Sequence, residues 1–361
     1  MVDPKLNLEP VLTAYGIDPA LASVEKISGG LINITWKVRS QNKQFVLQRV
    51  NKKVFNDPWA IVNNKHLIGN YLAQHHPNYL FVGEIPTKAK QLIFENEQGY
   101  FRLSTFVKDS HTISVVQTPE QAFEAAYQFG KFSKVLKDFD AMKLVLAIPD
   151  FHNLTLRYRQ FETACVSGNN ERITACQDVI KDVKRFYYLV EKYEAIRSNP
   201  NFKIRVMHHD TKISNVLFNP QDRSLCVIDL DTVMPGYFIS DVGDMMRTYL
   251  SPANEEESDF EKIEVRLDFF KAIAQGYLKA LGSEMTKDEI DSFTYSGLFM
   301  VYMQAIRFIT DHLNNDQYYE ARYEGHNLVR GQNQLTLLNE MVQKEKVLGQ
   351  IVKEESSKIR F

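Results

Sequence analysis

The sequence has little cysteine, no excess of charge of either sign and no long apolar run. The spacing of its three cysteines, Cys165, Cys176 and Cys226, matches neither a zinc site nor a secreted disulfide framework. The formal net charge of −2 gives no strong field that would attract nucleic acid or an anionic membrane. No apolar stretch approaches the roughly 20 residues of a membrane-spanning helix, and the first residues lack the basic and apolar parts of a signal peptide. We therefore expect a cytoplasmic protein whose partners include neither nucleic acid nor membrane.

Internal repeats, low-complexity segments and the G-x-x-x-x-G-K loop of Walker-type nucleotide sites are also missing from the sequence. The hydrophobic fraction of 44% and the aromatic fraction of 12% are typical of a folded globular protein. A chain of 361 residues is long enough for two domains, each with its own core.

The first hundred residues alternate between apolar and polar side chains, as β-strands do. One helix is expected in this part, with Pro58 in its first turn. The expected order is strand, strand, strand, helix, strand, strand, which is typical of a small kinase-type nucleotide lobe. The strands are predicted at 24–27, 34–39, 44–50, 91–95 and 100–104, and the helix at 58–75.

From Thr118 onward, apolar residues recur at helical spacing. Helices are predicted at 119–137, 169–197, 258–281, 287–313 and 330–353, with short strands at 205–207, 216–218 and 225–228. Together the patterns predict an α+β, bilobal, protein-kinase-like fold. A small β-rich N-lobe would span residues 1–104 and a larger, mainly helical C-lobe residues 105–361. The hinge between them is expected at about 104–108.

One short segment contains the side chains that move a phosphoryl group onto a hydroxyl. It has the order H-x-D-x-K-x-x-N, with Asp210, Lys212 and Asn215, and the I-D pair that ends at Asp229 follows. In such sites one carboxylate orients the hydroxyl and accepts its proton, while an amide and another carboxylate hold magnesium on the nucleotide. We expect Asp210 to be the base, Lys212 to reach the transferred phosphate, and Asn215 and Asp229 to bind Mg²⁺.

Several residues near this segment allow more than one interpretation. Asp231 is a second candidate for the metal or for the substrate. His208 and His209 invite a zinc reading, which we reject because no third ligand lies at the spacing of a zinc site. We expect His208 to brace the loop by hydrogen bonding. In the competing reading, Asp210 is an ordinary turn residue and Asn215 only caps a turn.

A Gly-Gly turn lies between two expected strands and includes Gly29, Gly30, Leu31 and Asn33. Glycines let a backbone approach phosphates closely, so this turn is a candidate flap over ATP. An ordinary hairpin turn is the alternative.

The chain resembles the choline kinase and aminoglycoside phosphotransferase superfamily, and within it the N-acetylhexosamine 1-kinases. The matching segments extend over nearly the whole chain in the order of the family. They are Gly29 to Asn33, Val46 to Asn51, His208 to Phe218, Val227 to Gly236, Asp241 to Arg247 and Arg307 to Leu313.

This resemblance implies transfer of the γ-phosphoryl group of ATP, with Mg²⁺, to the anomeric hydroxyl of GlcNAc or GalNAc. Asp210 would be the base, Asn215 and Asp229 would bind magnesium, and residues 29–33 would cover the phosphates. The hinge residues Thr105, Phe106 and Val107 would border the nucleotide. The sugar pocket would include Arg307 and, with a structural salt bridge between the first two as the alternative, Asp244, Arg247 and Tyr302.

One departure concerns the ion pair that kinases generally form between a strand lysine and a helix glutamate. Gln48 occupies the position of the lysine, and the expected helix at 58–75 contains neither Asp nor Glu. We hypothesise that Gln48 contacts phosphate or pairs with an amide, Asn63 or Asn64. Arg49 is a rival for the lysine, but strand alternation turns it to the opposite face.

Two other functions remain open from the sequence. The acceptor could be an aminoglycoside, a choline-like alcohol or another sugar, or the chain could be a non-catalytic, pseudokinase-like module that binds ATP. The missing ion pair favours the latter, and the intact set Asp210, Asn215 and Asp229 argues against it. Neither the oligomeric state nor the choice between GlcNAc and GalNAc follows from the sequence.

Overall fold

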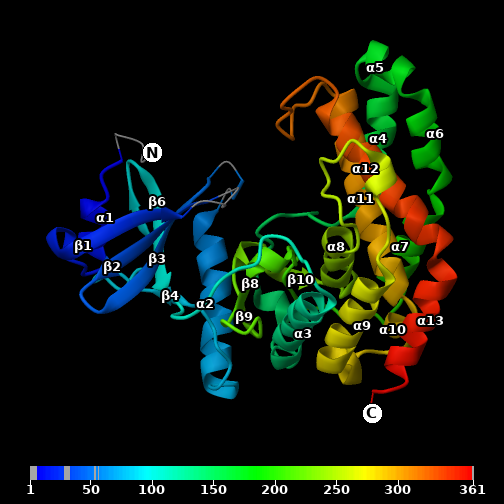
Figure 1. The fold of residues 1–361 in the computed structure, drawn as a ribbon. Helices are drawn as coiled ribbons and strands as arrows, with labels where there is room; N and C mark the ends of the chain where they lie inside the picture. Colours follow the sequence, from blue (N-terminus) through cyan, green and yellow to red (C-terminus); the bar gives the residue numbers. More distant parts are fainter. Residues whose placement is uncertain (1–5, 28–32, 53, 56, 360–361) are drawn as a thin grey trace.

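The computed structural model describes residues 6–27, 33–52, 54–55 and 57–359. Gly29, Gly30 and Leu31 of the expected flap lie outside these residues. Figure 1 shows a small sheet on one side, a larger helical region on the other, and helix α2 between them. The bilobal α+β architecture is therefore confirmed. Below, the N-lobe is the sheet with α1, and the C-lobe is everything from α3 onward.

The N-lobe is an antiparallel sheet in the order β1-β2-β3-β6-β4, with β5 also paired to β6. One face carries Trp36, Val38, Leu47, Phe101 and Leu103, which form a core with helix α1 (Glu9–Ala14). The predicted strands are found, although the one expected at 91–95 begins only at Phe94. The bounds are β1 Ala22–Ile27, β2 Ile34–Ser40, β3 Lys43–Val50, β4 Glu84–Ile85, β5 Phe94–Asn96 and β6 Gly99–Thr105.

Helix α2 (Pro58–His75) has the predicted bounds, and it contacts both lobes. Asp57 caps its first turn by accepting hydrogen bonds from the backbone N–H groups of residues 59 and 60. Lys65 forms an ion pair with Glu84 of β4 at 2.9 Å. Farther along, Ile68 and Leu72 belong to the core of the C-lobe. Ile61 packs with Val50 of β3, so the helix contacts the sheet in its first half and the C-lobe core in its second half.

The C-lobe helices differ from the predicted ones mainly in their breaks. The segment 169–197 forms three helices, 287–313 is interrupted at Ser292, and the helix expected from 258 begins at Leu267. The bounds are α3 Pro119–Val135, α4 Leu154–Ser167, α5 Asn170–Ala175, α6 Gln177–Arg185, α7 Tyr188–Ser198, α8 Ile239–Tyr249, α9 Leu267–Leu281, α10 Lys287–Asp291, α11 Phe293–Leu313, α12 His326–Gln343 and α13 Glu345–Ser356.

The sequence patterns did not predict α4 and α8. Helix α4 does carry apolar residues at helical spacing, Leu154, Tyr158, Phe161 and Ala164, so its signal was present. Helix α8 is buried on nearly all sides, and its polar residues Ser240, Asp241 and Asp244 are buried as well, so the helix has no exposed face. Helix α11 is also almost wholly buried, packed between α8, α12 and α4. Among the helices of the described residues, none is both long enough and apolar enough to cross a lipid bilayer.

The close packing of α8 on α11 requires glycine at position 243. A Cβ atom there would lie 2.3 Å from the backbone oxygen of Ser296 and 2.8 Å from the Cβ atom of Met300. We predict that Gly243→Ala lowers the free energy of unfolding by roughly 1–3 kcal/mol, because the overlap outweighs the helix preference of alanine. Urea unfolding measures the change.

Gly349→Ala is the matched control, because it makes the same substitution in the exposed face of α13. A Cβ atom at position 349 meets nothing within 4 Å. This variant should be as stable as the original chain or more stable by up to about 1 kcal/mol. Equal effects at the two positions would contradict the proposed overlap.

Candidate active site

The segment from 205 to 236 folds into two small antiparallel pairs in the C-lobe. Strand β7 (Arg205–Met207) pairs with β10 (Met234–Gly236), and β8 (Val216–Phe218) pairs with β9 (Ser224–Val227). Two short 3₁₀ turns, η3 (Ile213–Asn215) and η4 (Leu230–Thr232), lie beside the β8–β9 hairpin. Beyond the last pair of that hairpin, the backbone N–H of Ile228 donates to the carbonyl of Asn215 at 2.9 Å. Asn215 and Asp229 are thereby brought side by side.

Asp210 lies in the same group. The amide nitrogen of Asn215 donates to the backbone carbonyl and to Oδ2 of Asp210, each at 2.9 Å. Lys212 places its ammonium nitrogen 2.9 Å from the same Oδ2. Burial by itself would raise the pKa of the Asp210 carboxyl, but Lys212 and Asn215 outweigh it and hold the pKa below its usual value. Asp210 is therefore ionised at neutral pH, and no described residue donates a hydrogen bond to its Oδ1.

Asp229 has the opposite electrostatic character. Burial, together with the negative charges of Asp231 and Asp210, raises the pKa of Asp229 to about 6, although Lys212 and Arg102 oppose this effect. Its backbone is in the left-handed region, with φ 58°. The ionised form of a carboxylate that lies among other carboxylates is stabilised by a nearby cation. The residue thus combines a strained backbone with an excess of negative charge.

The donor set at this point fits magnesium. Mg²⁺ is usually held by one or two protein oxygens together with phosphates and water. Asp229 supplies a carboxylate, and the Asn215 Oδ1 receives no hydrogen bond within the described part of the chain, since its amide nitrogen is the atom that faces Asp210. No group of three His, Cys, Asp or Glu side chains suited to a metal occurs among the described residues.

Helix α8 holds the loop that carries Asp210. The Asp241 carboxylate accepts the backbone N–H groups of His208 at 3.0 Å and His209 at 2.8 Å. Asp244 accepts the N–H of Thr211 at 2.8 Å, and the Tyr249 hydroxyl donates to the carbonyl of Thr211. Three side chains of α8, those of Asp241, Asp244 and Tyr249, therefore fix the backbone of the loop.

Asp244 and Arg247, expected in a sugar pocket, form the salt bridge that was the alternative reading. The Arg247 Nε atom lies 3.1 Å from the Asp244 carboxylate, and its Nη1 atom lies 2.9 Å from Glu255. The negative charge of Asp210 raises the pKa of both Asp244 and Arg247, so both side chains lie close to the loop. The structure gives the pair a supporting position under the loop.

The two histidines of the loop contact neighbouring groups of the C-lobe. His208 bonds through Nε2 to the carbonyl of Ile228 at 2.9 Å, which is the bracing role that was expected. The ring of His209 contacts the ring of His152, with 3.3 Å between the two Nδ1 atoms. Burial and the neighbouring His208 lower the pKa of His209 to about 4. Burial and His209 likewise hold the pKa of His152 well below its usual value.

The carboxylate of Asp231 is bound by N-lobe side chains, so the expectation that it contacts metal or substrate is corrected. Arg102 of β6 binds both of its carboxylate oxygens, Nη1 to Oδ1 at 2.5 Å and Nη2 to Oδ2 at 2.9 Å. The Asn33 amide nitrogen also donates to Oδ2, at 2.7 Å. Since both oxygens are occupied by N-lobe donors, Asp231 connects the lobes.

Gln48 has partners other than the expected ones. It donates to Thr35 at 3.2 Å and accepts from the Arg102 Nε atom at 3.0 Å. Asn64 instead bonds to backbone groups of the C-lobe, at Val145 and Val233. The predicted pairing of Gln48 with Asn64 is therefore wrong, and Asn63 is exposed. Contact of Gln48 with phosphate stays a prediction.

Arg102 is a residue that the sequence reasoning missed. It lies directly opposite Gln48 in the register of β3 and β6, and its side chain is 3% exposed. A signal was present, because the alternation of β6 turns a positive charge toward the face opposite Phe101 and Leu103. Only the strand pairing, however, identifies the partner strand.

The expected hinge follows directly after β6. The N–H of Phe106 donates to the carbonyl of Gln44 at 3.1 Å, and the Lys37 ammonium lies 3.8 Å from the centre of the Phe106 ring. The Val107 carbonyl accepts the hydroxyl of Ser110 at 2.7 Å. Contact of residues 105–107 with a nucleotide, like the boundary at 104–108, stays a prediction.

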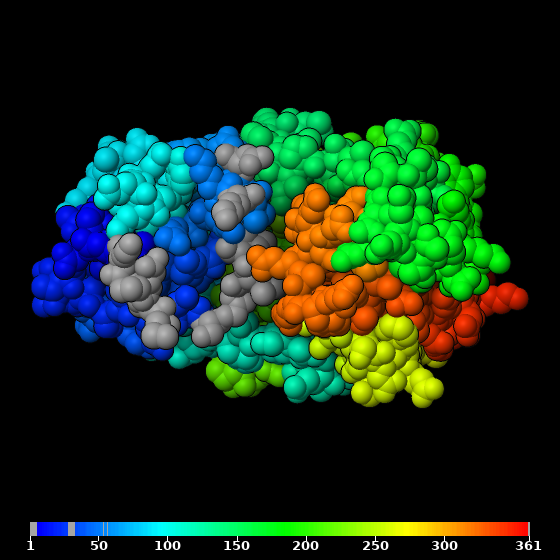
Figure 2. All heavy atoms as spheres, turned by 90° about the horizontal axis from the view of Figure 1, so that it is seen from above, coloured from blue at the N-terminus to red at the C-terminus, as the bar shows by residue number. Residues whose placement is uncertain are grey.

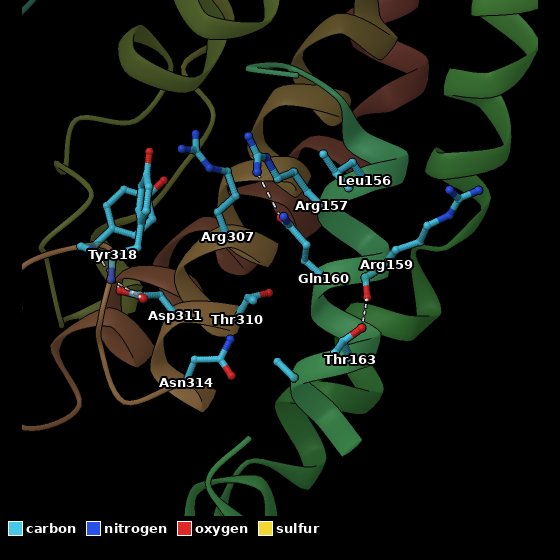
Figure 3. Close-up of a pocket in the computed structure, with 12 residues that line it drawn as sticks. Leu156, Arg157, Arg159, Gln160, Thr163, Arg307, Thr310, Asp311, Asn314 and Tyr318 are labelled. Carbon is cyan, nitrogen blue, oxygen red and sulfur yellow. Dashed lines mark hydrogen bonds between the residues drawn. The ribbon is translucent and has the colours of Figure 1, made fainter. Parts of the chain in front are cut away.

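A pocket of about 600 Å³ lies between α4, α11 and the segment that follows α11. Figure 3 shows Arg157 and Arg307 extending toward the same end of it, whereas Arg159 points away. The hydrogen-bond partners of Arg157 and Arg307 among the described residues are neutral, namely Gln160, the Asp150 carbonyl and Gln304. The pocket therefore carries positive charge that the described residues do not neutralise.

Asp311 does not offset this charge inside the pocket. Its carboxylate accepts the backbone N–H groups of Tyr318 and Tyr319, each at 2.8 Å. It thereby holds the segment after α11, which faces the N-lobe across the middle of the molecule in Figure 2 (orange). Arg307 lies 5.8 and 5.4 Å from the centres of the Tyr318 and Tyr319 rings. The guanidinium of Arg307 therefore already lies beside the two tyrosine rings that line the pocket.

Tyr302 is not part of this pocket, which corrects the expectation for that residue. Its side chain is fully buried in the C-lobe core, and its hydroxyl donates to the carbonyl of Val183 at 2.8 Å. Of the four expected sugar-pocket residues, Arg307 alone lines the pocket. Asp244 and Arg247 lie beneath the neighbouring loop, as described above.

A small sheet lobe, a helical lobe and a paired Asp-Asn-Asp cluster between them define a kinase-like phosphotransferase. The sequence matches the APH phosphotransferase enzyme family over residues 23–279, which is more than half of the chain. The protein belongs to this family, which places it in the aminoglycoside and choline kinase superfamily.

Solved structures with the same fold are distant in sequence. An aminoglycoside phosphotransferase from Alicyclobacillus acidocaldarius subsp. acidocaldarius matches with a TM-score of 0.63 and 12% identity, over 99% of this chain and 98% of that one. An ethanolamine kinase from Plasmodium vivax matches with a TM-score of 0.58 and 14% identity, over 96% and 94%. A spectinomycin phosphotransferase in complex with ADP and spectinomycin matches with 0.56 and 13%, over 96% and 97%. At these identities the likeness concerns the fold.

The buried, neutral His209 predicts how stability responds to acid. Below pH 6.5 the unfolded chain binds a proton at this side chain, whereas the folded protein does not until about pH 4. Its contribution to stability is therefore complete above pH 6.5 and is lost as the pH falls toward 4, up to roughly 3 kcal/mol. We predict a shallower loss between pH 6.5 and 4.5 in His209→Asn, measured by urea unfolding.

Asparagine suits this test because it tolerates the left-handed backbone of residue 209, whose φ is 65°. His66→Asn is the control, since His66 is exposed on α2. The control should lose stability in acid as the original chain does. A His209→Asn variant with an unchanged pH dependence would show that His209 is not the group that titrates.

Proposed function

We propose that this protein is an ATP- and Mg²⁺-dependent kinase that phosphorylates the anomeric hydroxyl of an N-acetylhexosamine, GlcNAc or GalNAc, to give the sugar 1-phosphate. The observation that carries the proposal is that Asn215 bonds to Asp210 through its side chain and to Ile228, the residue before Asp229, through its backbone carbonyl. The resemblance of the sequence to N-acetylhexosamine 1-kinases gives the acceptor, and the charge of the C-lobe pocket supports it.

In this proposal Asp210 is the general base. Its Oδ2 is fixed by Lys212 and Asn215, which leaves Oδ1 to accept the proton of the sugar hydroxyl. The hydroxyl oxygen bonds to the γ-phosphorus as the bond between that phosphorus and the β–γ bridging oxygen breaks, and ADP leaves. Because the pKa of Asp210 is held low, the base is ready at neutral pH, and its main contribution is orientation of the hydroxyl.

Asn215 and Asp229 would hold the magnesium ion, with Oδ1 of the amide and the carboxylate as ligands. Bound there, the ion neutralises charge on the β- and γ-phosphates of the nucleotide. Lys212, which contacts the same Asp210 oxygen as Asn215, would direct its ammonium toward the transferred phosphoryl group. Residues 29–33, 48 and 105–107 remain the proposed nucleotide contacts.

The charge of the pocket beside Arg307 favours a neutral, oxygen-rich acceptor. Aminoglycosides and ethanolamine carry positive charge, which Arg157 and Arg307 would repel. A choline-like cation would need the faces of Tyr318 and Tyr319, where Arg307 already lies. Sugar hydroxyls and an acetamido carbonyl, in contrast, are acceptors for guanidinium donors.

A non-catalytic, pseudokinase-like module is the other candidate. The absence of the usual strand-lysine and helix-glutamate pair is the observation in its favour. Against it stands the presence of Asp229 beside the hydrogen-bonded pair of Asp210 and Asn215, since a module that only binds nucleotide has no need of an ionised base.

We predict that Asp210→Asn loses at least roughly 10²-fold in kcat, because the amide cannot accept the proton. Binding of Mg²⁺ and ATP should change far less, since Asp210 is not among the proposed metal ligands. Coupled-enzyme detection of ADP gives kcat, and calorimetry gives the affinity for Mg²⁺·ATP. Thr211→Ser, which keeps its hydrogen bonds, is a control that should retain activity. Near-normal turnover in Asp210→Asn would exclude Asp210 as the base.

The acceptor is tested with a panel of GlcNAc, GalNAc, glucose, ethanolamine, choline and an aminoglycoside, each with Mg²⁺ and ATP. We predict ADP release with GlcNAc or GalNAc and none with the cationic alcohols. The methyl glycoside of the active sugar is the matched control, because only its anomeric oxygen is blocked. It should not react, and phosphorus NMR should place the phosphate on the anomeric carbon. Turnover of the methyl glycoside or of a cationic alcohol would refute the proposed acceptor.

A further inference from the structure

Four buried side chains of alternating charge run from helix α2 to the segment that carries Asp229. Lys65 pairs with Glu84 at 2.9 Å, the Arg102 Nε atom lies 3.9 Å from the same Glu84 oxygen, and Arg102 pairs with Asp231. Their side chains are 10, 2, 3 and 4% exposed, in that order. Charges so far removed from water are stable only when each has a close partner of opposite sign.

This series of ion pairs crosses the boundary between the lobes. Glu84 and Arg102 belong to strands of the N-lobe sheet, whereas Asp231 lies in η4, two residues after Asp229. Asn33, at the start of β2, adds a second connection to Asp231, and its own Oδ1 accepts the N–H of Asn51. Two parts of the N-lobe therefore hold the turn that presents Asp229.

The arrangement occupies the place of the ion pair that the sequence lacks. Gln48 stands where a strand lysine is expected, and α2 has no acidic residue. Here the helix supplies the cation, Lys65, and the strand supplies the anion, Glu84. Within the N-lobe, the positive charge that acts on Asp229 comes from Arg102 on the neighbouring strand, directly opposite Gln48.

We propose that Arg102 is a positioning residue whose ion pair with Asp231 fixes the N-lobe on the C-lobe and holds Asp229 where metal-bound nucleotide needs it. Arg102 serves here in place of the usual strand-lysine and helix-glutamate pair. Each of its three guanidinium nitrogens donates to Asp231 or Gln48, so in this proposal it acts through these partners and not by touching phosphate. The inference rests on the nucleotide and magnesium part of the proposed function and is independent of the sugar.

The chain offers a matched control for this ion pair. Arg205 binds both carboxylate oxygens of Glu289, at 2.5 and 2.9 Å, and this pair is also buried but lies wholly within the C-lobe. Asp231→Asn and Glu289→Gln each replace a carboxylate by the amide of the same shape and remove the charge that an arginine binds through both oxygens. Each carboxylate also accepts other hydrogen bonds, from Asn33 at Asp231 and from the backbone of Lys203 and Thr286 at Glu289. The two variants should therefore lose similar stability, which thermal unfolding measures.

They should differ in nucleotide binding and in the arrangement of the lobes. We expect Asp231→Asn to weaken Mg²⁺·ATP binding by at least tenfold in calorimetry, to require more Mg²⁺ for half-maximal binding, and to increase the radius of gyration in solution scattering. Glu289→Gln should stay within about twofold of the original affinity, with an unchanged radius. Arg102→Met should match Asp231→Asn, and the double variant should be no weaker than the poorer single one.

Two results would overturn the proposal. One is an Asp231→Asn variant that binds Mg²⁺·ATP as the original chain does, with the same radius of gyration. The other is a loss of binding in Glu289→Gln as large as in Asp231→Asn, since the effect would then be general destabilisation. If the original chain binds Mg²⁺·ATP but phosphorylates no sugar, the proposed acceptor fails while this test of Arg102 remains valid.

Discussion

The Asp241 carboxylate is the contact on which the geometry of the site depends. It accepts two consecutive backbone N–H groups, those of His208 and His209, from a fully buried position on α8. Hydrogen bonds to a charged group are worth about 1.5–3 kcal/mol each, and they hold residue 209 in a left-handed conformation that an L-residue does not favour. The chain direction at Asp210 follows from this turn, so α8 determines where the carboxylate proposed as the base points.

The two lobes are connected by polar contacts as well as by the chain. The N-lobe reaches the segment of Asp229 through Arg102 and Asn33, while α2 is buried in the C-lobe core and tied to the sheet through Lys65 and Glu84. Because isolated buried charges are costly, these contacts specify one relative position of the lobes. The site contains Asp210, whose carboxyl pKa is lowered, and Asp229, whose carboxyl pKa is raised. This separation is the electrostatic pattern expected of a base beside a metal ligand.

Much of the fold was readable from the sequence, for reasons that differ by element. Apolar and polar side chains alternate along β2, β3 and β6, and α2 has a buried and an exposed side, so their periods and the Asp57-Pro58 start are visible. Helix α8 is buried together with its polar residues, and the break at Ser292 between α10 and α11 has no proline to mark it. In the candidate site, Asp210, Asn215 and Asp229 were found because their spacing along one hairpin is short. Arg102 and Asp231 are 129 positions apart, and no local pattern joins them.

The sequence by itself determined the two-lobed class and the identity of the side chains around Asp210, because these depend on local periodicity and short spacing. Only the tertiary structure decided that Asp231 is bound by Arg102, that Gln48 turns to Thr35, and that Tyr302 is buried against Val183. The physical reason is that hydrogen bonds and ion pairs between distant segments depend on how strands and helices pack. A side chain's partner is then chosen by three-dimensional proximity and burial, neither of which a linear pattern contains.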